Sequence, residues 1–125
     1  RLIDTGQPVP MFGDGSSRRD YTYIDDIMQG VLNAIDRCEG YEIFNLGESR
    51  TVALIDLIRL IEEYLGKEAK IKRLPEQPGD VPITYADITK ARQKLGYNPR
   101  FPLEEGLRRF VEWYQREKTY IYPES

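Results

Sequence analysis

Apolar residues recur at helical spacing in two segments of the first half of the chain. The first segment predicts a helix that starts at Asp25 or Asp26 and ends at Gly40, and the second predicts a helix from about Ala53 to Leu65. A stripe of this kind marks the face by which a helix packs against other elements. The stripes comprise Ile24, Ile27, Met28, Val31, Leu32 and Ile35 in the first helix, and Leu54, Leu57, Ile58, Ile61 and Leu65 in the second.

Two more helices are expected nearer the C-terminus. One is short and spans residues 87–95. The other starts near Pro102, with acidic residues in its first turn that interact favourably with the positive end of the helix dipole. Beyond this last helix, residues 119–125 are expected to form a frayed tail. The buried stripe of the last helix is predicted to comprise Leu103, Leu107, Phe110, Val111 and Tyr114.

Short apolar or alternating runs between the helices predict strands. Val9–Phe12, Tyr21–Ile24 and Ala69–Leu74 are candidates, and Glu42–Leu46 (EIFNL) is typical of a strand buried on both faces. Proline and glycine over 75–82 predict a long irregular loop. The expected fold class is mixed α/β, with about four helices and several short strands. Six apolar residues are expected to pack together: Leu54, Ile58, Ile61, Leu107, Phe110 and Val111.

Composition narrows the class of protein. The chain of 125 residues is long enough for one domain with a real core, and its hydrophobic share of 40% is typical of a globular protein. The net charge of −3 gives no sign of a nucleic-acid partner, and no apolar run approaches the roughly 20 residues of a membrane span. The single cysteine, Cys38, fits a reducing cytoplasm. Histidine is absent, which excludes Ser-His and Cys-His catalysis within the chain.

The stretch FGDGSSRRDYTY at 12–23 raises the question of a phosphate site. Its two glycines begin like a dinucleotide-binding loop, in which a third glycine leads into a helix whose N-terminus binds the pyrophosphate. Arg18 stands in the place of the third glycine, and the residues that follow are predicted to be extended. The loop therefore does not fit a dinucleotide site.

The adjacent arginines need another explanation. Side chains alternate along an extended segment, which places Arg19 on one face with Tyr21 and Tyr23. A guanidinium beside tyrosines is a plausible clamp for an anion. The alternative is an ordinary surface ion pair between Arg19 and a carboxylate. The opposite face is predicted to carry Arg18, Asp20 and Thr22.

Two other motifs have both a functional and a structural interpretation. Asp80 projects from the Pro-Gly-Asp turn, where its carboxylate can accept hydrogen bonds from two neighbouring sugar hydroxyls or simply bond its own turn. Tyr114 and Lys118 have the Tyr-x-x-x-Lys spacing of short-chain dehydrogenases. Since Tyr114 belongs to an apolar helical stripe, we interpret this pair as core packing.

Four blocks of the sequence resemble, in the same order, the C-terminal half of NAD-dependent nucleotide-sugar epimerases of the extended short-chain dehydrogenase/reductase family. The branch that the chain most resembles is the UDP-glucuronate 4-epimerases. The resemblance implies the substrate-binding portion of an extended Rossmann-type epimerase, and it covers nearly the whole chain. The blocks are PVPMFGDGSSRRDYTYIDDIMQGV, YEIFNLGES, LPEQPGDVPITYADITKARQKLGYNP and LEEGLRRFVEWYQ.

The resemblance implies a role in UDP-sugar binding for particular residues. Arg19 corresponds to the arginine that contacts the UDP diphosphate in the family, with Tyr21 nearby. Pro10 and Phe12 correspond to the residues that surround uracil. Asp80 corresponds to the carboxylate that holds the ribose hydroxyls.

Gln77 marks a difference between branches of the family. Galactose-type epimerases carry a second phosphate-binding arginine at this place, so the resemblance does not imply a two-arginine clamp here. Glucuronate-type relatives also carry glutamine, which favours their branch and makes Gln77 the sixth candidate substrate-binding residue.

The resemblance also implies what this chain lacks. The family binds NAD and carries its catalytic Tyr-x-x-x-Lys in an N-terminal half, and this chain begins at Arg1 without methionine, so we interpret residues 1–125 as a fragment from which the NAD-binding domain is absent. We predict no catalytic, cofactor-binding or metal-binding residue within it. The full-length enzyme is expected to invert C4 of UDP-glucuronate or UDP-glucose through a 4-keto intermediate, and the fragment alone is expected to be inactive.

Other functions and partners stay open. A related nucleotide-sugar dehydratase or decarboxylase could use the same half, because fold and nucleotide binding do not fix the chemistry. A non-enzymatic binding domain is a weaker alternative.

The family implies a full-length homodimer. In the family, the helix at 24–37 and the EIFNL strand also pack onto the sheet of the NAD domain. A fragment without that sheet is expected to expose an apolar edge there, which predicts association between copies.

Overall fold

The computed structural model describes residues 1–123, and the contacts within the chain divide it into two compact units. Unit 1 comprises Arg1–Ser17, Ala53–Pro82 and the chain from Leu107 onward, and unit 2 comprises Arg18–Val52 and Ile83–Gly106. The chain passes between the units four times. None of the helices in the described residues combines the length and the apolar composition that a membrane span requires. The fold class is mixed α/β, as predicted.

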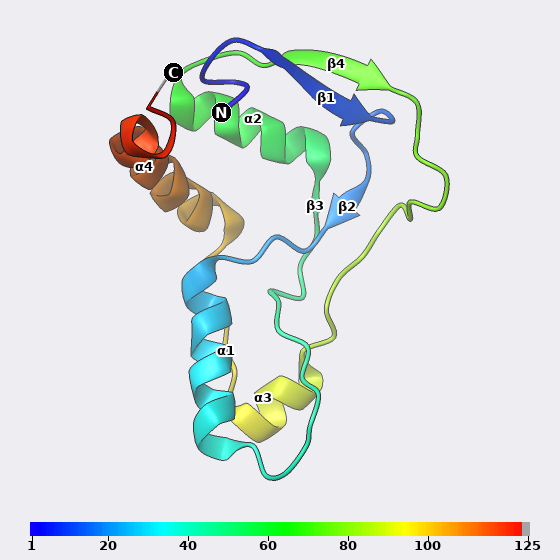
Figure 1. Cartoon of the computed structure of the whole chain (residues 1–125). Helices are drawn as coiled ribbons and strands as arrows, with labels where there is room; N and C mark the ends of the chain where they lie inside the picture. Colours follow the sequence, from blue (N-terminus) through cyan, green and yellow to red (C-terminus); the bar gives the residue numbers. More distant parts are fainter. Residues whose placement is uncertain (124–125) are drawn as a thin grey trace. The chain divides into compact units, whose positions relative to one another are not determined.

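A pair of parallel strands and one helix form the centre of unit 1. β1 (Pro8–Phe12) runs parallel to β4 (Lys70–Leu74), with the first residues of the two strands opposite each other. Parallel strands cannot be joined by a tight turn, and here α2 (Leu54–Leu65) leads back into β4 (Figure 1). The sequence predicts all three elements to within one residue at either end.

The core of unit 1 forms between the apolar stripe of α2 and the inward side of β1. Ile58 of the helix, Met11 of the strand and Ile3 of the N-terminal turn are buried together. These three side chains are surrounded by partly buried apolar residues, namely Val9, Leu54, Ile55, Ile61, Leu65 and Ala69.

The last helix, α4 (Leu103–Ile121), is longer than predicted. It includes the first three residues of the tail expected to fray, and residues 124 and 125 of that tail lie outside the described residues. The prediction of a buried Phe110 is wrong: its ring is 52% exposed and stacks on Trp113, with 5.7 Å between centroids. Three other members of the predicted stripe are buried, namely Leu107, Val111 and Tyr114.

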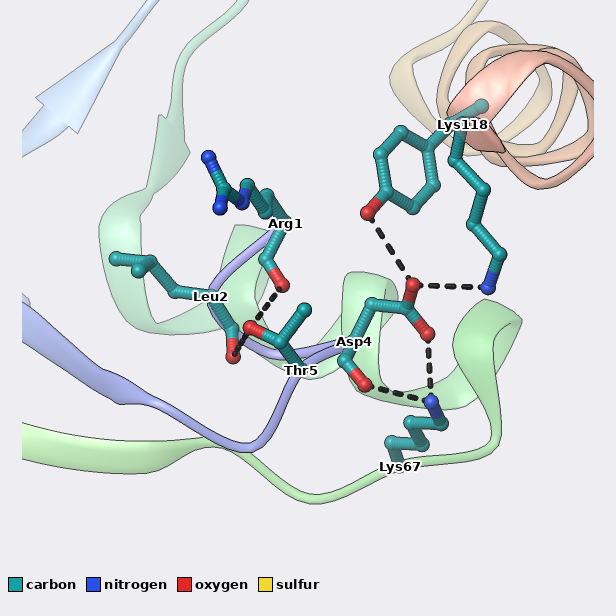
Figure 2. Close-up of polar contacts among 7 residues, drawn as sticks. Arg1, Leu2, Asp4, Thr5, Lys67 and Lys118 are labelled. Atoms are coloured by element: carbon teal, nitrogen blue, oxygen red, sulfur yellow. Dashed lines mark hydrogen bonds and ion pairs between the residues drawn. The ribbon is translucent and has the colours of Figure 1, made fainter. Parts of the chain in front are cut away.

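A buried carboxylate joins the N-terminal turn of unit 1 to the residues just after α2 and to α4. Asp4 accepts hydrogen bonds from the Nζ atoms of Lys67 (2.6 Å) and Lys118 (2.9 Å), between which it lies in Figure 2, and from the hydroxyl of Tyr114 (3.2 Å). The two lysines lower the pKa of Asp4 to about 2. Tyr114 and Lys118 thus meet on a structural carboxylate, which agrees with the interpretation of their spacing as core packing.

Acid should therefore destabilise this chain through Asp4. The pKa of Asp4 is lower in the folded than in the unfolded state, so ionised Asp4 stabilises the fold above about pH 4. This contribution to the free energy of unfolding is about 2 kcal/mol, and it is lost as the pH falls toward 2. We expect Asp4→Asn to lower the free energy of unfolding at pH 7, and the difference from wild type to shrink as the pH approaches 2. Urea denaturation at pH 7, 4 and 2 measures this. A difference that stays constant with pH would contradict it.

Two helices pack against each other in unit 2. α1 (Ile24–Arg37) lies beside α3 (Thr89–Leu95) (Figure 1). The short helix ends at Gly96, whose left-handed φ of 66° suits glycine. The buried core of unit 2 comprises Ile88, Ala91, Leu95 and Tyr97.

The apolar stripe of α1 faces outward rather than into this core. Ile35, for example, is 73% exposed, whereas Asp26 and Gly30 are the buried residues of the helix. Gly30 is required there, because a Cβ at this position would come within 2.6 Å of the Leu46 methyl groups. The exposed apolar edge predicted for this helix is therefore present.

Two of the predicted strands are wrong. Before α1, strand pairing is confined to β2 (Arg18–Arg19), which pairs with β3 (Val52–Ala53). Residues 21–23 form no strand, and Ile24 is already the first residue of α1. The segment Glu42–Leu46 also belongs to no strand, and it is not buried on both faces, since Ile43 is 67% exposed. A strand needs a neighbouring strand to pair with, and within residues 1–123 no strand pairs with this segment.

Candidate functional site

Four of the six predicted site residues line one of two hollows, one hollow within each unit. The first, which we call the Phe12 hollow, has a volume of about 110 Å³ and lies in unit 1. It contains three of the six candidates: Phe12, Gln77 and Asp80. Pro10 lies on β1 close by in sequence but does not line it. The walls of the Phe12 hollow are Phe12, Gly13, Asp14, Ser16, Ser17, Glu76, Gln77, Asp80, Val81 and Pro82.

The loop at residues 13–15 forms one wall of the Phe12 hollow, and its backbone conformation requires glycine at two positions. Gly13 and Gly15 both have left-handed φ angles, of 74° and 84°. A Cβ on Gly15 would also come within 2.9 Å of the Met11 sulfur. Between these two glycines, the Asp14 carboxylate accepts a hydrogen bond from the Ser16 N–H at 2.8 Å. The Ser16 side chain and, after it, this backbone bond lower the pKa of Asp14. The loop leads into β2 and not into a helix, as predicted from the extended pattern of the residues that follow it.

The opposite wall of the Phe12 hollow is the Pro-Gly-Asp turn. Gly79 has a φ of 86°, and the Asp80 N–H donates to the Gln77 carbonyl at 3.1 Å, which closes the turn. This backbone bond holds Gln77 and Asp80 at the hollow, while Phe12 contributes a ring that is 41% exposed. The hollow therefore combines an exposed aromatic face with hydrogen-bond acceptors.

The second hollow, which we call the Arg19 hollow, lies in unit 2 and has a volume of about 500 Å³. Arg19 donates from Nη1 to the carbonyl of Arg18 at 2.8 Å. The side chain of Arg18 is held differently, because its Nε and Nη2 donate to the hydroxyl and carbonyl oxygens of Thr51 at 3.0 and 2.7 Å. Of the two adjacent arginines, only Arg19 lines the hollow. Its walls are Arg19, Asp20, Thr22, Phe44, Asn45, Leu46, Thr84, Tyr85 and Ala86.

The predicted alternation of side chains around Arg19 is wrong. Arg19 lines the same hollow as Asp20 and Thr22, which were assigned to the opposite face, and Tyr21 does not line it. The reason is that β2 ends at Arg19, so the strict two-residue period stops there. Tyr21 is half-buried nearby, and burial raises the pKa of its hydroxyl while the charge of Arg19 partly offsets that rise.

Sequence reasoning missed the part that Asp20 plays. Its carboxylate accepts hydrogen bonds from the backbone N–H groups of Glu48 and Ser49, both at 2.9 Å, and of Ala86 at 3.2 Å. These partners are 28, 29 and 66 residues away in the chain. The only signal in the sequence is the position of Asp20 between Arg19 and Tyr21, which gives no indication of such distant contacts.

The two hollows suit different kinds of chemical group. The Phe12 hollow is below the roughly 300–1,000 Å³ of typical ligand pockets, so it can take a part of a ligand, such as a base or a ribose. The Arg19 hollow is larger and contains a guanidinium, the group best suited to phosphate oxygens. Residues 1–123 contain no group of three or more histidine, cysteine or acidic side chains that could hold a metal ion.

Comparison with known proteins defines the class of protein. The chain belongs to the GDP-mannose 4,6 dehydratase family, whose model matches residues 2–110. It is 42% identical to a UDP-glucuronate 4-epimerase of Thermodesulfobacterium geofontis over 108 residues, which are 86% of this chain and 33% of the relative. The chain spans about a third of the length of the curated relatives it matches.

Two solved structures are similar to the chain over most of its length. One is the UDP-glucose 4-epimerase of Thermotoga maritima with UDP-glucose, with a TM-score of 0.85, 36% identity, and coverage of 94% of this chain and 38% of that one. The other is the UDP-glucuronic acid 4-epimerase of Bacillus cereus with UDP-glucuronic acid and NAD, with a TM-score of 0.81, 34% identity, and coverage of 93% and 38%.

Proposed function

We propose that this chain is the UDP-sugar-binding part of an NAD-dependent nucleotide-sugar 4-epimerase that inverts C4 of UDP-glucuronate or UDP-glucose. The observation that carries the proposal is the Arg19 hollow, where one of two adjacent arginines lines a cavity while the other is held by Thr51. The similarity to 4-epimerases over more than nine-tenths of the chain supports it. The single free cysteine, Cys38, supports the cytoplasm as its compartment.

Each proposed role follows from the chemistry of a side chain. Arg19 presents a planar fork of donors to the diphosphate, with Tyr21 beside it. In the Phe12 hollow, the ring of Phe12 stacks on uracil near Pro10. Asp80 accepts hydrogen bonds from the ribose hydroxyls. Holding the nucleotide keeps the sugar at the reacting centre, because binding energy from a remote part of a substrate can be used for orientation.

NAD would be held outside these residues. A pyrophosphate site of the dinucleotide-binding kind needs a glycine loop that opens a helix, and the loop at 13–15 opens β2 instead. The residues described here therefore do not fit NAD, and the cofactor, which would supply hydride transfer, belongs to the rest of the full-length protein.

The choice of nucleotide tests the proposed function. The name of the matched family refers to a guanosine nucleotide and to a dehydratase, whereas the similar solved structures are of enzymes named for UDP-sugars. We expect the full-length protein to bind UDP at least about tenfold more tightly than GDP, since a pocket shaped for one base leaves polar groups unpaired with the other. Calorimetric titration with both nucleotides decides this. Tighter binding of GDP would favour the dehydratase alternative.

The 125-residue chain alone should show no C4 inversion, even with NAD added. The glycine loop among residues 1–123 does not fit NAD, and none of these residues is assigned as a general base. Proton NMR of UDP-glucuronate incubated with the chain and NAD measures this, with the full-length protein as the positive control. Product formed by the chain alone would overturn the assignment of the chemistry to the rest of the protein.

Copies of the chain should also associate through the apolar edge of unit 2, and the full-length protein is proposed to be a homodimer. Ile35 and Ile43 are 73% and 67% exposed, and grouped apolar residues on a surface favour association. We expect sedimentation equilibrium to show an average mass that rises with concentration, and Ile35→Glu to reduce that rise. A strictly monomeric wild-type chain at high concentration would contradict the prediction.

A further inference from the structure

Asp20 accepts several hydrogen bonds from other segments of unit 2. Its Oδ1 accepts the Glu48 N–H at 2.9 Å and the Thr22 hydroxyl at 3.2 Å, and its Oδ2 accepts the N–H groups of Ser49 at 2.9 Å and Ala86 at 3.2 Å. A carboxylate offers about four lone-pair sites, and four donors occupy them here. Asp20 is therefore fully used by the protein and is not placed to bind a ligand itself.

The turn that Asp20 holds is fixed from two sides. Ser49 has a left-handed φ of 59°, a conformation that a residue with a side chain keeps only where its surroundings impose it. On the other side, the hydroxyl of Tyr97, which is 1% exposed, donates to the Gly47 carbonyl at 2.9 Å. A Cβ on Gly47 would meet Oδ2 of Asp20 at 2.7 Å and Cβ of Ala86 at 2.8 Å.

The backbone segments that Asp20 holds adjoin or form the walls of the Arg19 hollow. Leu46 precedes the fixed turn and lines the hollow, Ala86 both bonds Asp20 and lines it, and Arg19 is the residue before Asp20. One carboxylate thus connects the chain at Arg19 to both other segments that form the cavity. Loss of these bonds would let the walls move independently of the guanidinium.

We propose that Asp20 is a positioning residue for phosphate binding in the Arg19 hollow. It acts through the backbone of Gly47–Ser49 and Ala86 and makes no contact with the ligand. The inference rests on the proposed function, in which Arg19 binds the diphosphate of a UDP-sugar.

The test compares two carboxylates that both accept backbone N–H groups in unit 2. Asp20→Asn replaces one acceptor oxygen with an NH₂ group that faces N–H donors. Asp26→Asn makes the same replacement where the Asp26 carboxylate accepts the N–H groups of Arg100 and Phe101, and Asp26 lines neither hollow. In the full-length protein at a temperature where both variants are folded, we expect Asp20→Asn to bind UDP about tenfold more weakly or worse, because small displacements of a binding group carry large penalties. Asp26→Asn should bind UDP as wild type does.

Amide hydrogen exchange gives a second measurement. The Glu48 and Ser49 amides should exchange faster in Asp20→Asn and at the wild-type rate in Asp26→Asn. If Asp20→Asn does not fold, Gly47→Ala serves in its place, because the added methyl group displaces the same carboxylate without removing it. It should weaken UDP binding in the same direction.

The outcomes separate this inference from the proposed function. If the wild-type protein binds UDP and Asp20→Asn binds it equally well, the inference fails and the proposed function stands. If the two Asn variants lose affinity equally, Asp20 is only a structural residue, and the inference again fails. If the wild-type protein does not bind UDP, the proposed function fails, and the inference is overturned with it.

Discussion

Arg19→Ala in the full-length protein is expected to weaken UDP binding by about 10- to 150-fold. A charge-assisted hydrogen bond contributes roughly 1.5–3 kcal/mol, and each 1.4 kcal/mol is about tenfold in affinity. Among the described residues that line the Arg19 hollow, Arg19 is the one cation, so no other wall residue compensates for its loss. Isothermal titration calorimetry with UDP measures the change.

Three variants make the Arg19 result specific. Arg19→Lys should recover only part of the affinity, because an ammonium group cannot reproduce the planar fork. Asp80→Ala should have a smaller effect than Arg19→Ala, since water can replace its bonds to ribose more easily. Arg18→Ala is the matched control, because the Arg18 side chain is held by Thr51, and it should bind UDP as wild type does. If Arg19→Ala binds UDP normally, Arg19 is only part of a surface ion pair.

The largest loss of stability is expected from Asp26→Ala. The carboxylate is 1% exposed and accepts the backbone N–H groups of Arg100 and Phe101 at 2.8 and 2.9 Å. Alanine would remove the carboxylate from both of these part-buried hydrogen bonds, and a donor that loses its acceptor in this way costs about 1–3 kcal/mol. We expect the free energy of unfolding to fall by about 2–4 kcal/mol, measured by urea denaturation followed by circular dichroism.

Asp36 on the same helix provides the control for Asp26. It is exposed, so Asp36→Ala should change the free energy of unfolding by no more than about 0.5 kcal/mol. If Asp26→Ala unfolds at the same urea concentration as wild type, the connection between α1 and the segment at 100–101 contributes little to the fold.

The helices could be predicted from the sequence because their signals are local. Leu54–Leu65 has an apolar stripe and a glycine stop, and both signals lie within the helix itself. The turn at Gly79 was predictable for the same reason. The candidate site followed only in part: three of the six residues named beforehand line one hollow, and Arg19 lines the other.

The remaining features depend on contacts between distant parts of the chain. The segment Glu42–Leu46 has the composition of a buried strand, but whether it pairs depends on a neighbour that its own residues do not specify. The stripe of α1 predicts a packing face without saying what covers it. Asp20 is ordinary in the sequence because its partners are up to 66 residues away. Local sequence patterns therefore predict helices and strands better than they predict the long-range contacts that position a site.

Conversion of UDP-glucuronate by the full-length protein tests the central claim most directly. The protein would be incubated with NAD and UDP-glucuronate, and the products followed by proton NMR. Our account predicts a C4-inverted UDP-sugar that approaches an equilibrium mixture with the substrate, with UDP-glucose assayed in parallel as the other candidate. Unchanged substrates, or a product that has lost water or carbon dioxide in place of C4 inversion, would contradict it.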